Sequence, residues 1–110
     1  MTMIKEISPL QLKQKIESKA PLYLLDVREA NEVAICMLDG ANHIPMNLIP
    51  LYLDKIPDGV DIVIYCHHGV RSLNVANYLV ENGFDSDFLY NLTGGIDAWA
   101  QRIDTSMPKY

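Results

Sequence analysis

The spacing of apolar positions changes repeatedly along the chain, and it predicts strands alternating with helices. Short continuous apolar runs are typical of strands buried on both faces, whereas apolar residues three and four positions apart are typical of helices. The predicted strands cover residues 4–7, 22–27, 42–45, 61–65 and 87–90. The predicted helices cover residues 9–18, 29–35, 48–55, 72–82 and 95–103. This alternation predicts an α/β fold with a parallel sheet and helices on both of its faces.

The helix at 9–18 has a clear start signal. Ser8 is a predicted N-cap, with Pro9 at the first helical position and Gln11 completing a capping box. Because such a box satisfies backbone N–H groups that the first turn leaves open, we expect the helix to begin at Pro9.

A cysteine stands where the strand at 61–65 ends. Cys66 follows the apolar run and precedes a loop and a helix, so its thiol lies at the carboxyl edge of the predicted sheet, where open α/β sheets bind ligands. The loop backbone and the helix start offer N–H groups to an anion. We therefore expect a catalytic cysteine that handles an anionic or sulfur-bearing substrate. The predicted substrate-binding residues follow it directly: His67, His68, Gly69, Val70, Arg71 and Ser72.

Length, composition and charge limit the classes of protein. The 110 residues, 49% of them hydrophobic, predict one domain with a core over residues 1–110. The net charge of −5 and the lack of a basic run argue against nucleic acid or an anionic membrane surface as partners. No apolar stretch approaches the roughly 20 residues of a membrane span, and residues 1–10 lack the apolar core of a signal peptide. We expect a cytoplasmic protein.

The cysteines and histidines do not predict a metal centre. Cys36 and Cys66 are too few for a secreted disulfide scaffold of this size, and they lack the C-x-x-C spacing of a zinc site. Cys66, His67 and His68 are adjacent on one loop, and adjacent ligands do not easily converge on a tetrahedral ion. We therefore expect no metal ligands and favour the nucleophile.

Four segments resemble motifs of the rhodanese family of sulfurtransferases. The segments are 25–29 (LDVRE), similar to its D-V-R-E motif, 42–45 (NHIP), similar to G-H-I-P, 66–72 (CHHGVRS), similar to C-x-x-G-x-R-S, and 94–99 (GGIDAW), similar to G-G-x-x-x-W. Their order and spacing cover nearly the whole chain, although Asn42 replaces a glycine that is usual in the family. The resemblance implies a single rhodanese domain with a five-stranded parallel sheet, a persulfide on Cys66, and no cofactor.

The residues at 66–72 also suit sulfur transfer on chemical grounds. Only a thiolate attacks, and the loop N–H groups, the helix start and the charge of Arg71 all favour the thiolate of Cys66. The same groups stabilise a persulfide anion, and a guanidinium can bind a small dianionic donor such as thiosulfate. With the rhodanese resemblance, we expect the sulfur to pass on to a thiophilic acceptor, cyanide in vitro and a small thiol or a protein in the cell.

Two other functions remain open from the sequence. One is a sulfur carrier or binding module whose Cys66 is loaded by a partner protein. The other is a phosphatase or arsenate reductase of similar architecture. The related phosphatases carry a C-x5-R loop that accommodates phosphate, whereas four residues separate Cys66 from Arg71 here. The shorter loop favours sulfur over phosphate.

Several other residues have structural interpretations. We expect Cys36 in the core and His43 in a structural hydrogen bond. Asp26 and Arg28 are expected to form an ion pair at the strand end, where Arg28 is also a candidate for adding positive potential to the site. The pair Gly94-Gly95 lacks the spacing of a phosphate-binding loop and predicts a tight entry into the last helix.

Overall fold

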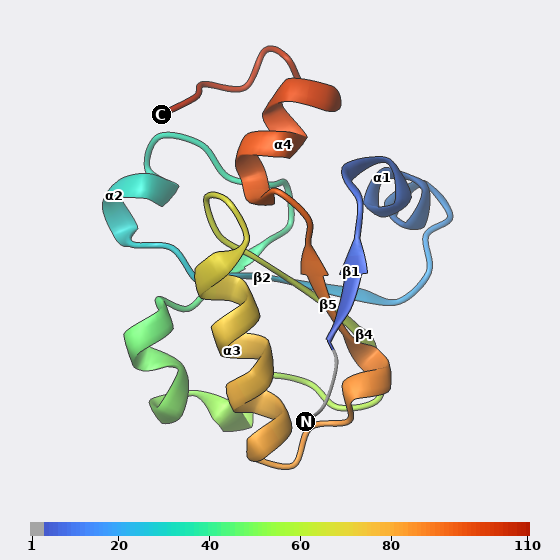
Figure 1. Cartoon of the computed structure of the whole chain (residues 1–110), viewed down its shortest axis with the longest axis vertical. Coiled ribbons are helices and arrows are strands. Elements are labelled where there is room, and N and C mark those ends of the chain that lie inside the picture. The colour runs from blue at the N-terminus through green and yellow to red at the C-terminus, as the bar shows by residue number, and fades with distance from the viewer. Residues whose placement is uncertain (1–3) are drawn as a thin grey trace.

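The structure, a computed structural model, describes residues 4–110 (Figure 1). Within this part of the chain, five parallel strands form one sheet in the order β1-β5-β4-β2-β3. The strands are β1 (Lys5–Ile7), β2 (Leu22–Asp26), β3 (Asn42–His43), β4 (Asp61–Tyr65) and β5 (Leu89–Leu92). The predicted α/β class is confirmed. Residues 1–3 lie outside the described residues. They belong to the predicted domain and to the segment 1–10 that was expected to lack a signal peptide.

Helices cover both faces of the sheet. They are α1 (Pro9–Glu17), α2 (Ala30–Val33), α3 (Val70–Glu81) and α4 (Gly95–Arg102), with 3-10 segments η1 (Met46–Leu51), η2 (Leu53–Lys55) and η3 (Ser86–Phe88). Helices α1 and α4 lie on one face, and α3 with η1 lies on the other (Figure 1). The alternation along β4 produces these two layers, because Ile62 and Ile64 pack in the cluster on the α3 side while Val63 and Tyr65 pack in the cluster on the α4 side.

The predicted element boundaries are correct at the amino end of α1 and at β4. Elsewhere they differ: the strand expected at 42–45 ends at His43, the helix expected at 29–35 covers only Ala30–Val33, and three larger differences follow. The capping box of Ser8 and Gln11 is present, and α1 begins at Pro9. The helix expected at 48–55 is instead two 3-10 segments. The helical stretch begins at Met46, so Pro50 falls beyond its first turn, where an α-helix would need the N–H that proline lacks. The last strand begins at Leu89 rather than at 87, since residues 86–88 form a 3-10 turn capped by the Asp85 side chain. Helix α3 begins two residues earlier than expected, at Val70.

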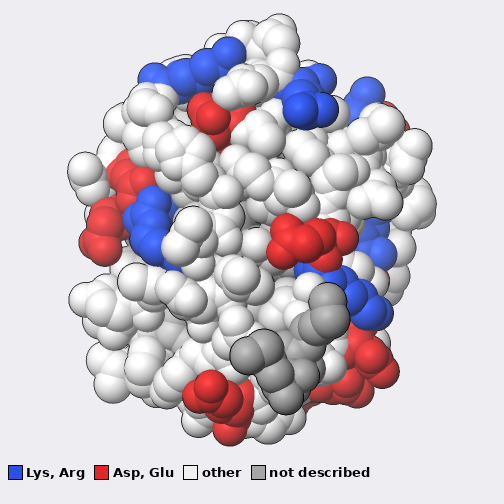
Figure 2. Space-filling view, viewed as in Figure 1, with Lys and Arg blue, Asp and Glu red and all other residues white. Residues whose placement is uncertain are grey.

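The charged side chains do not form a block of one sign on the face shown in Figure 2. Basic and acidic groups are interspersed there among broad uncharged areas. Among the helices of residues 4–110, we find none with the length and apolar character that a bilayer crossing requires.

A buried ion pair stands at the carboxyl end of β2. Both side chains, Asp26 and Arg28, are fully buried, with Arg28 Nη2 2.6 Å from Asp26 Oδ2 and Arg28 Nε 2.9 Å from Oδ1. Arg28 Nη2 also donates to the carbonyl oxygen of Cys36 at 2.7 Å. His43 Nε2 lies 2.6 Å from the carbonyl oxygen of Arg28. The expected structural roles of this pair and of His43 are confirmed, while Cys36 is only partly buried against the core.

Replacing Asp26 by Asn should destabilise the fold strongly, because the guanidinium of Arg28 stays buried without its counter-charge. Breaking a buried pair from one side costs about 3–5 kcal/mol. The matched control is Asp61→Asn, which breaks a partly exposed pair with Lys15 at 2.7 Å and should cost below about 1 kcal/mol. Urea denaturation of both variants measures the difference, and equal losses would contradict a special role for the buried pair.

Candidate active site

Cys66 lies directly after β4, at the carboxyl edge of the sheet. Its side chain is 1% exposed. The N–H of Gly69 donates to Cys66 Sγ at 3.1 Å. Gly69 has φ of 109°, in the left-handed region that favours glycine, and this conformation turns the chain back so that its N–H faces the sulfur. The segment 66–72 therefore wraps around the thiol instead of leading away from it.

The environment of Cys66 favours the thiolate. Burial raises the pKa of the thiol, but hydrogen bonds from the Ser72 hydroxyl and from the backbone N–H groups of Ser72, Gly69 and His68 outweigh burial and place the pKa below its usual value. The donors to the anion are mostly fixed backbone dipoles. The arrangement suits a buried anionic sulfur.

Ser72 and Asn91 form a second layer behind the sulfur. Ser72 Oγ lies 3.4 Å from Cys66 Sγ and donates to Asn91 Oδ1 at 2.5 Å, so the hydroxyl must rotate to donate to a thiolate. Asn91 Nδ2 in turn donates to the carbonyl oxygen of Gly69 at 3.0 Å. Asn91 was not predicted as a site residue from the sequence. The signal for it is a polar residue within β5, where a buried side chain needs partners for its amide.

Arg71 is held by a carboxylate that the sequence did not pair with it. Arg71 Nη1 and Nη2 donate to Glu32 Oε1 and Oε2 at 2.7 and 2.9 Å. The hydrogen bond from Arg71 lowers the pKa of Glu32 to about 2, against the effect of burial, with help from the Glu29 N–H and the Tyr110 hydroxyl. The bond to Glu32 raises the pKa of Arg71, and the nearby charge of Cys66 adds to this rise. Two of the five guanidinium N–H groups are thus committed to Glu32.

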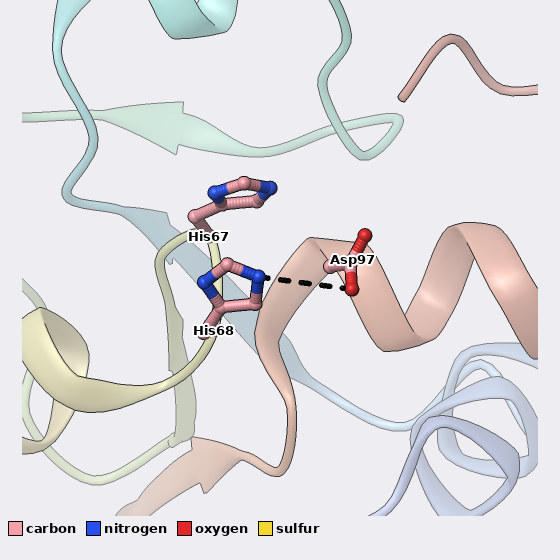
Figure 3. Close-up of side chains that lie close together, drawn as sticks. All are labelled: His67, His68 and Asp97. Carbon is pink, nitrogen blue, oxygen red and sulfur yellow. Dashed lines mark ion pairs between the residues drawn. The ribbon is translucent and has the colours of Figure 1, made fainter. Parts of the chain in front are cut away.

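The other residues of the segment 66–72 lie around the sulfur in different ways. Val70 is 71% exposed, beside the site. The ring of His67 stacks on that of Tyr110, with centroids 3.9 Å apart. His68 is exposed, and its Nε2 lies 3.7 Å from Asp97 Oδ2 (Figure 3). The segment thus presents its backbone to the Cys66 sulfur. The side chains of His67, His68 and Val70 lie around the site.

The amino end of α4 closes on the backbone of the same segment. The N–H groups of Ile96 and Asp97 donate to the carbonyl oxygens of Cys66 and His67 at 2.9 and 3.1 Å. Gly95 allows this approach, because a Cβ atom there would overlap both carbonyl groups. The sequence interpretation of Gly94-Gly95 as a tight helix entry is confirmed by their φ values of 75° and 63°.

Comparison with known proteins agrees with this arrangement. The profile of the rhodanese-like domain family matches residues 8–102. The chain belongs to this family. A Bacillus subtilis protein, YtwF, is 46% identical over 96 residues, covering 87% of this chain and 90% of its own length. The rhodanese resemblance drawn from the four sequence motifs is confirmed.

Two further rhodanese relatives cover most of the chain. The thiosulfate sulfurtransferase GlpE of Shewanella oneidensis is 33% identical over 99 residues, which are 90% of this chain and 95% of that protein. The crystal structure of a rhodanese-like domain protein from Staphylococcus aureus superposes with a TM-score of 0.80 at 36% identity, covering 87% of this chain and 91% of the other. The five-stranded rhodanese fold expected from the motifs is confirmed.

Replacing Gly95 by Ala should both destabilise the rhodanese fold and disturb its cysteine segment. The added Cβ meets the carbonyl groups of Cys66 and His67, so backbone must shift, and a loss of about 2 kcal/mol or more is expected. Gly83→Ala is the control, because Gly83 also has a positive φ, 96°, but no atom lies within 4 Å of an added Cβ. Its cost should be the conformational strain alone, about 1 kcal/mol. Thermal unfolding of the two variants, with alkylation rates of Cys66, checks the difference; similar behaviour would contradict the role of the close approach.

Proposed function

We propose that Cys66 carries sulfane sulfur as a persulfide, taken from thiosulfate or a similar anionic donor and given to a thiophilic acceptor. The protein is a sulfurtransferase of the rhodanese type. The observation that supports the role of Cys66 is its buried sulfur, held by a backbone N–H at 3.1 Å, with its thiol pKa below the usual value. The Shewanella relative is named for thiosulfate, which supports that donor class.

The proposed reaction has two steps. The thiolate of Cys66 attacks the outer sulfur of thiosulfate; a Cys66 S–S bond forms, the S–S bond of thiosulfate breaks, and its electron pair leaves with sulfite. An acceptor such as cyanide then attacks the outer persulfide sulfur, thiocyanate leaves, and the thiolate returns. Neither step transfers a proton, so no general base and no cofactor are needed. The N–H groups that favour the thiolate also suit the persulfide anion.

Arg71 is the proposed contact for the donor anion, together with the backbone of the segment 66–72. Its guanidinium keeps three N–H groups beyond those given to Glu32, and its charge acts on Cys66. The carboxylate of Glu32 competes with a dianionic donor for the same planar fork. Glu32 therefore limits how strongly thiosulfate binds.

The acceptor and the location in the cell belong to the same proposal. A small thiol or a protein is the proposed acceptor in the cell, and a cytoplasmic location suits an enzyme that works through a free thiol. A sulfur carrier loaded by a partner protein would use the same persulfide and differ only in its donor. The spacing of four residues between Cys66 and Arg71 favours sulfur over phosphate as substrate.

Incubation with thiosulfate should add one sulfur atom to Cys66, detected by mass spectrometry of the intact protein and of its peptides. Cys66→Ser should lose this adduct and lose thiocyanate formation from thiosulfate and cyanide, because a hydroxyl is a far weaker nucleophile. Cys36→Ser is the control and should retain both. Sulfur found on Cys36, or turnover retained in Cys66→Ser, would refute the proposal. An adduct formed only with a protein donor would identify the carrier alternative.

Arg71→Ala should lower kcat/KM for thiosulfate. A charge-assisted contact of about 1.5–3 kcal/mol corresponds to a loss of roughly ten- to a hundred-fold. Arg71→Lys should recover only part, since an ammonium lacks the planar fork. Glu32→Gln is the companion variant: it removes the competing charge and should lower the KM for thiosulfate. Steady-state kinetics with varied thiosulfate decide, and wild-type kinetics in Arg71→Ala would make Arg71 a structural partner of Glu32 alone.

A further inference from the structure

Three potential metal ligands from two separate segments meet beside the cysteine segment. His67 and His68 follow Cys66, and Asp97 lies in the first turn of α4. One ligand atom from each of the three lies within 4.8 Å of the other two. Figure 3 shows both imidazole rings turned with a nitrogen toward the carboxylate of Asp97. The packing of α4 on the segment produces this meeting, because the N–H of Asp97 donates to the carbonyl oxygen of His67 at 3.1 Å.

The Nε2 atom of His67 gives an independent indication. It is buried and has no hydrogen-bond partner among residues 4–110. A buried polar atom without a partner is costly, and such atoms in folded proteins often point to an ion or a water. The orphaned nitrogen and the meeting of three ligand atoms are independent observations that point to the same place. The stacked ring of Tyr110 holds the imidazole in place.

We propose that His67, His68 and Asp97 bind a divalent transition-metal cation, Zn²⁺ above all. Two imidazole nitrogens and one carboxylate oxygen suit Zn²⁺, whereas Ca²⁺ and Mg²⁺ prefer ligand sets made of oxygen atoms. Three protein ligands leave a fourth position, and the 63% exposure of the His68 side chain leaves that position open to solvent. The site lies next to the sulfur chemistry and does not use the thiol of Cys66.

The ligand atoms lie within 4.8 Å of one another, so they must approach by up to about 1.5 Å to close around an ion. Ligand atoms on a tetrahedral zinc ion lie about 3.3 Å apart, given metal–ligand distances of about 2.0–2.1 Å. The 3.7 Å separation of His68 Nε2 and Asp97 Oδ2 is already close to this value, and the exposed His68 is free to rotate. Asp97 Oδ2 also accepts from Gln101 Nε2 at 2.9 Å, which orients the carboxylate.

From the sequence we expected no metal ligands, because adjacent residues on one loop do not easily converge on an ion. In the structure the adjacent His67 and His68 nevertheless each bring a ring nitrogen within 4.8 Å of the other and of the Asp97 carboxylate. Asp97 supplies a ligand from a segment about thirty residues away. Lys109 lines the same narrow cleft as His67 and Asp97, and its charge opposes a cation, so we expect moderate rather than very tight binding.

Calorimetric titration of the chelator-stripped protein with ZnCl₂ tests this site. One Zn²⁺ per chain is expected, and His68→Ala and Asp97→Asn should each weaken binding about tenfold or more, since each removes a ligand. Asp58→Asn is the matched control; it neutralises an exposed carboxylate in the turn before β4, at the opposite edge of the sheet, and should bind as the wild type does. Zn²⁺ should also raise the unfolding temperature of the wild type but not of Asp97→Asn.

Cys66→Ser separates this site from simple binding of zinc to the thiol. The variant should retain zinc binding, because the sulfur is not a proposed ligand. Loss of binding in Cys66→Ser, or unchanged affinity in both His68→Ala and Asp97→Asn, would overturn the proposal, as would the absence of binding to the wild type. Circular dichroism of each variant confirms that it is folded. None of these results bears on sulfur transfer, which is measured separately through the thiosulfate adduct.

Discussion

The contact between the amino end of α4 and the backbone at Cys66 and His67 is the constraint on which the site depends. Two N–H groups of α4 donate to the carbonyl oxygens of these residues. Because Gly95 has no side chain, the backbone of α4 can approach the backbone of the cysteine segment closely. With these carbonyl groups turned toward α4, N–H groups of the segment 66–72 are free to face the sulfur. The orientation of the donors is thus set by packing between elements and is present before any substrate arrives.

The fixed dipoles of backbone N–H groups, rather than unpaired cations, therefore stabilise negative charge on the Cys66 sulfur. Both nearby guanidinium groups already have carboxylate partners: Arg28 is buried against Asp26, and Arg71 is held by Glu32. Pairing with a carboxylate cancels most of the field of an arginine at a distance. A backbone N–H at 3.1 Å acts directly on the sulfur and needs no reorganisation when the charge develops. The thiol pKa is lowered by the Ser72 hydroxyl together with these backbone N–H groups, against the effect of burial.

Local signals predicted the parts of the structure that neighbours in sequence control. The capping box at Ser8 and the apolar run of β4 specified their elements, and Cys66 was placed because it follows that run. Residues 48–55 were mistaken for an α-helix because apolar spacing does not reveal a 3-10 geometry around Pro50. Glu32, Asn91 and Asp97 could not be assigned, since each meets its partner only after distant segments have packed.

Sulfur transfer of the proposed kind makes little demand on proton chemistry, and this bears on the two histidines. The leaving group is a stable anion and the nucleophile is already a thiolate, so neither His67 nor His68 is needed as a base. The backbone N–H of His68 donates to the Cys66 sulfur and the carbonyl oxygen of His67 accepts from α4, while Asp97 lies within 4.8 Å of a ring nitrogen of each histidine. The imidazole of His67 leaves its buried Nε2 atom without a hydrogen-bond partner among residues 4–110, and an unpaired buried polar atom costs free energy. A cation bound by the ligands proposed above would offset that cost.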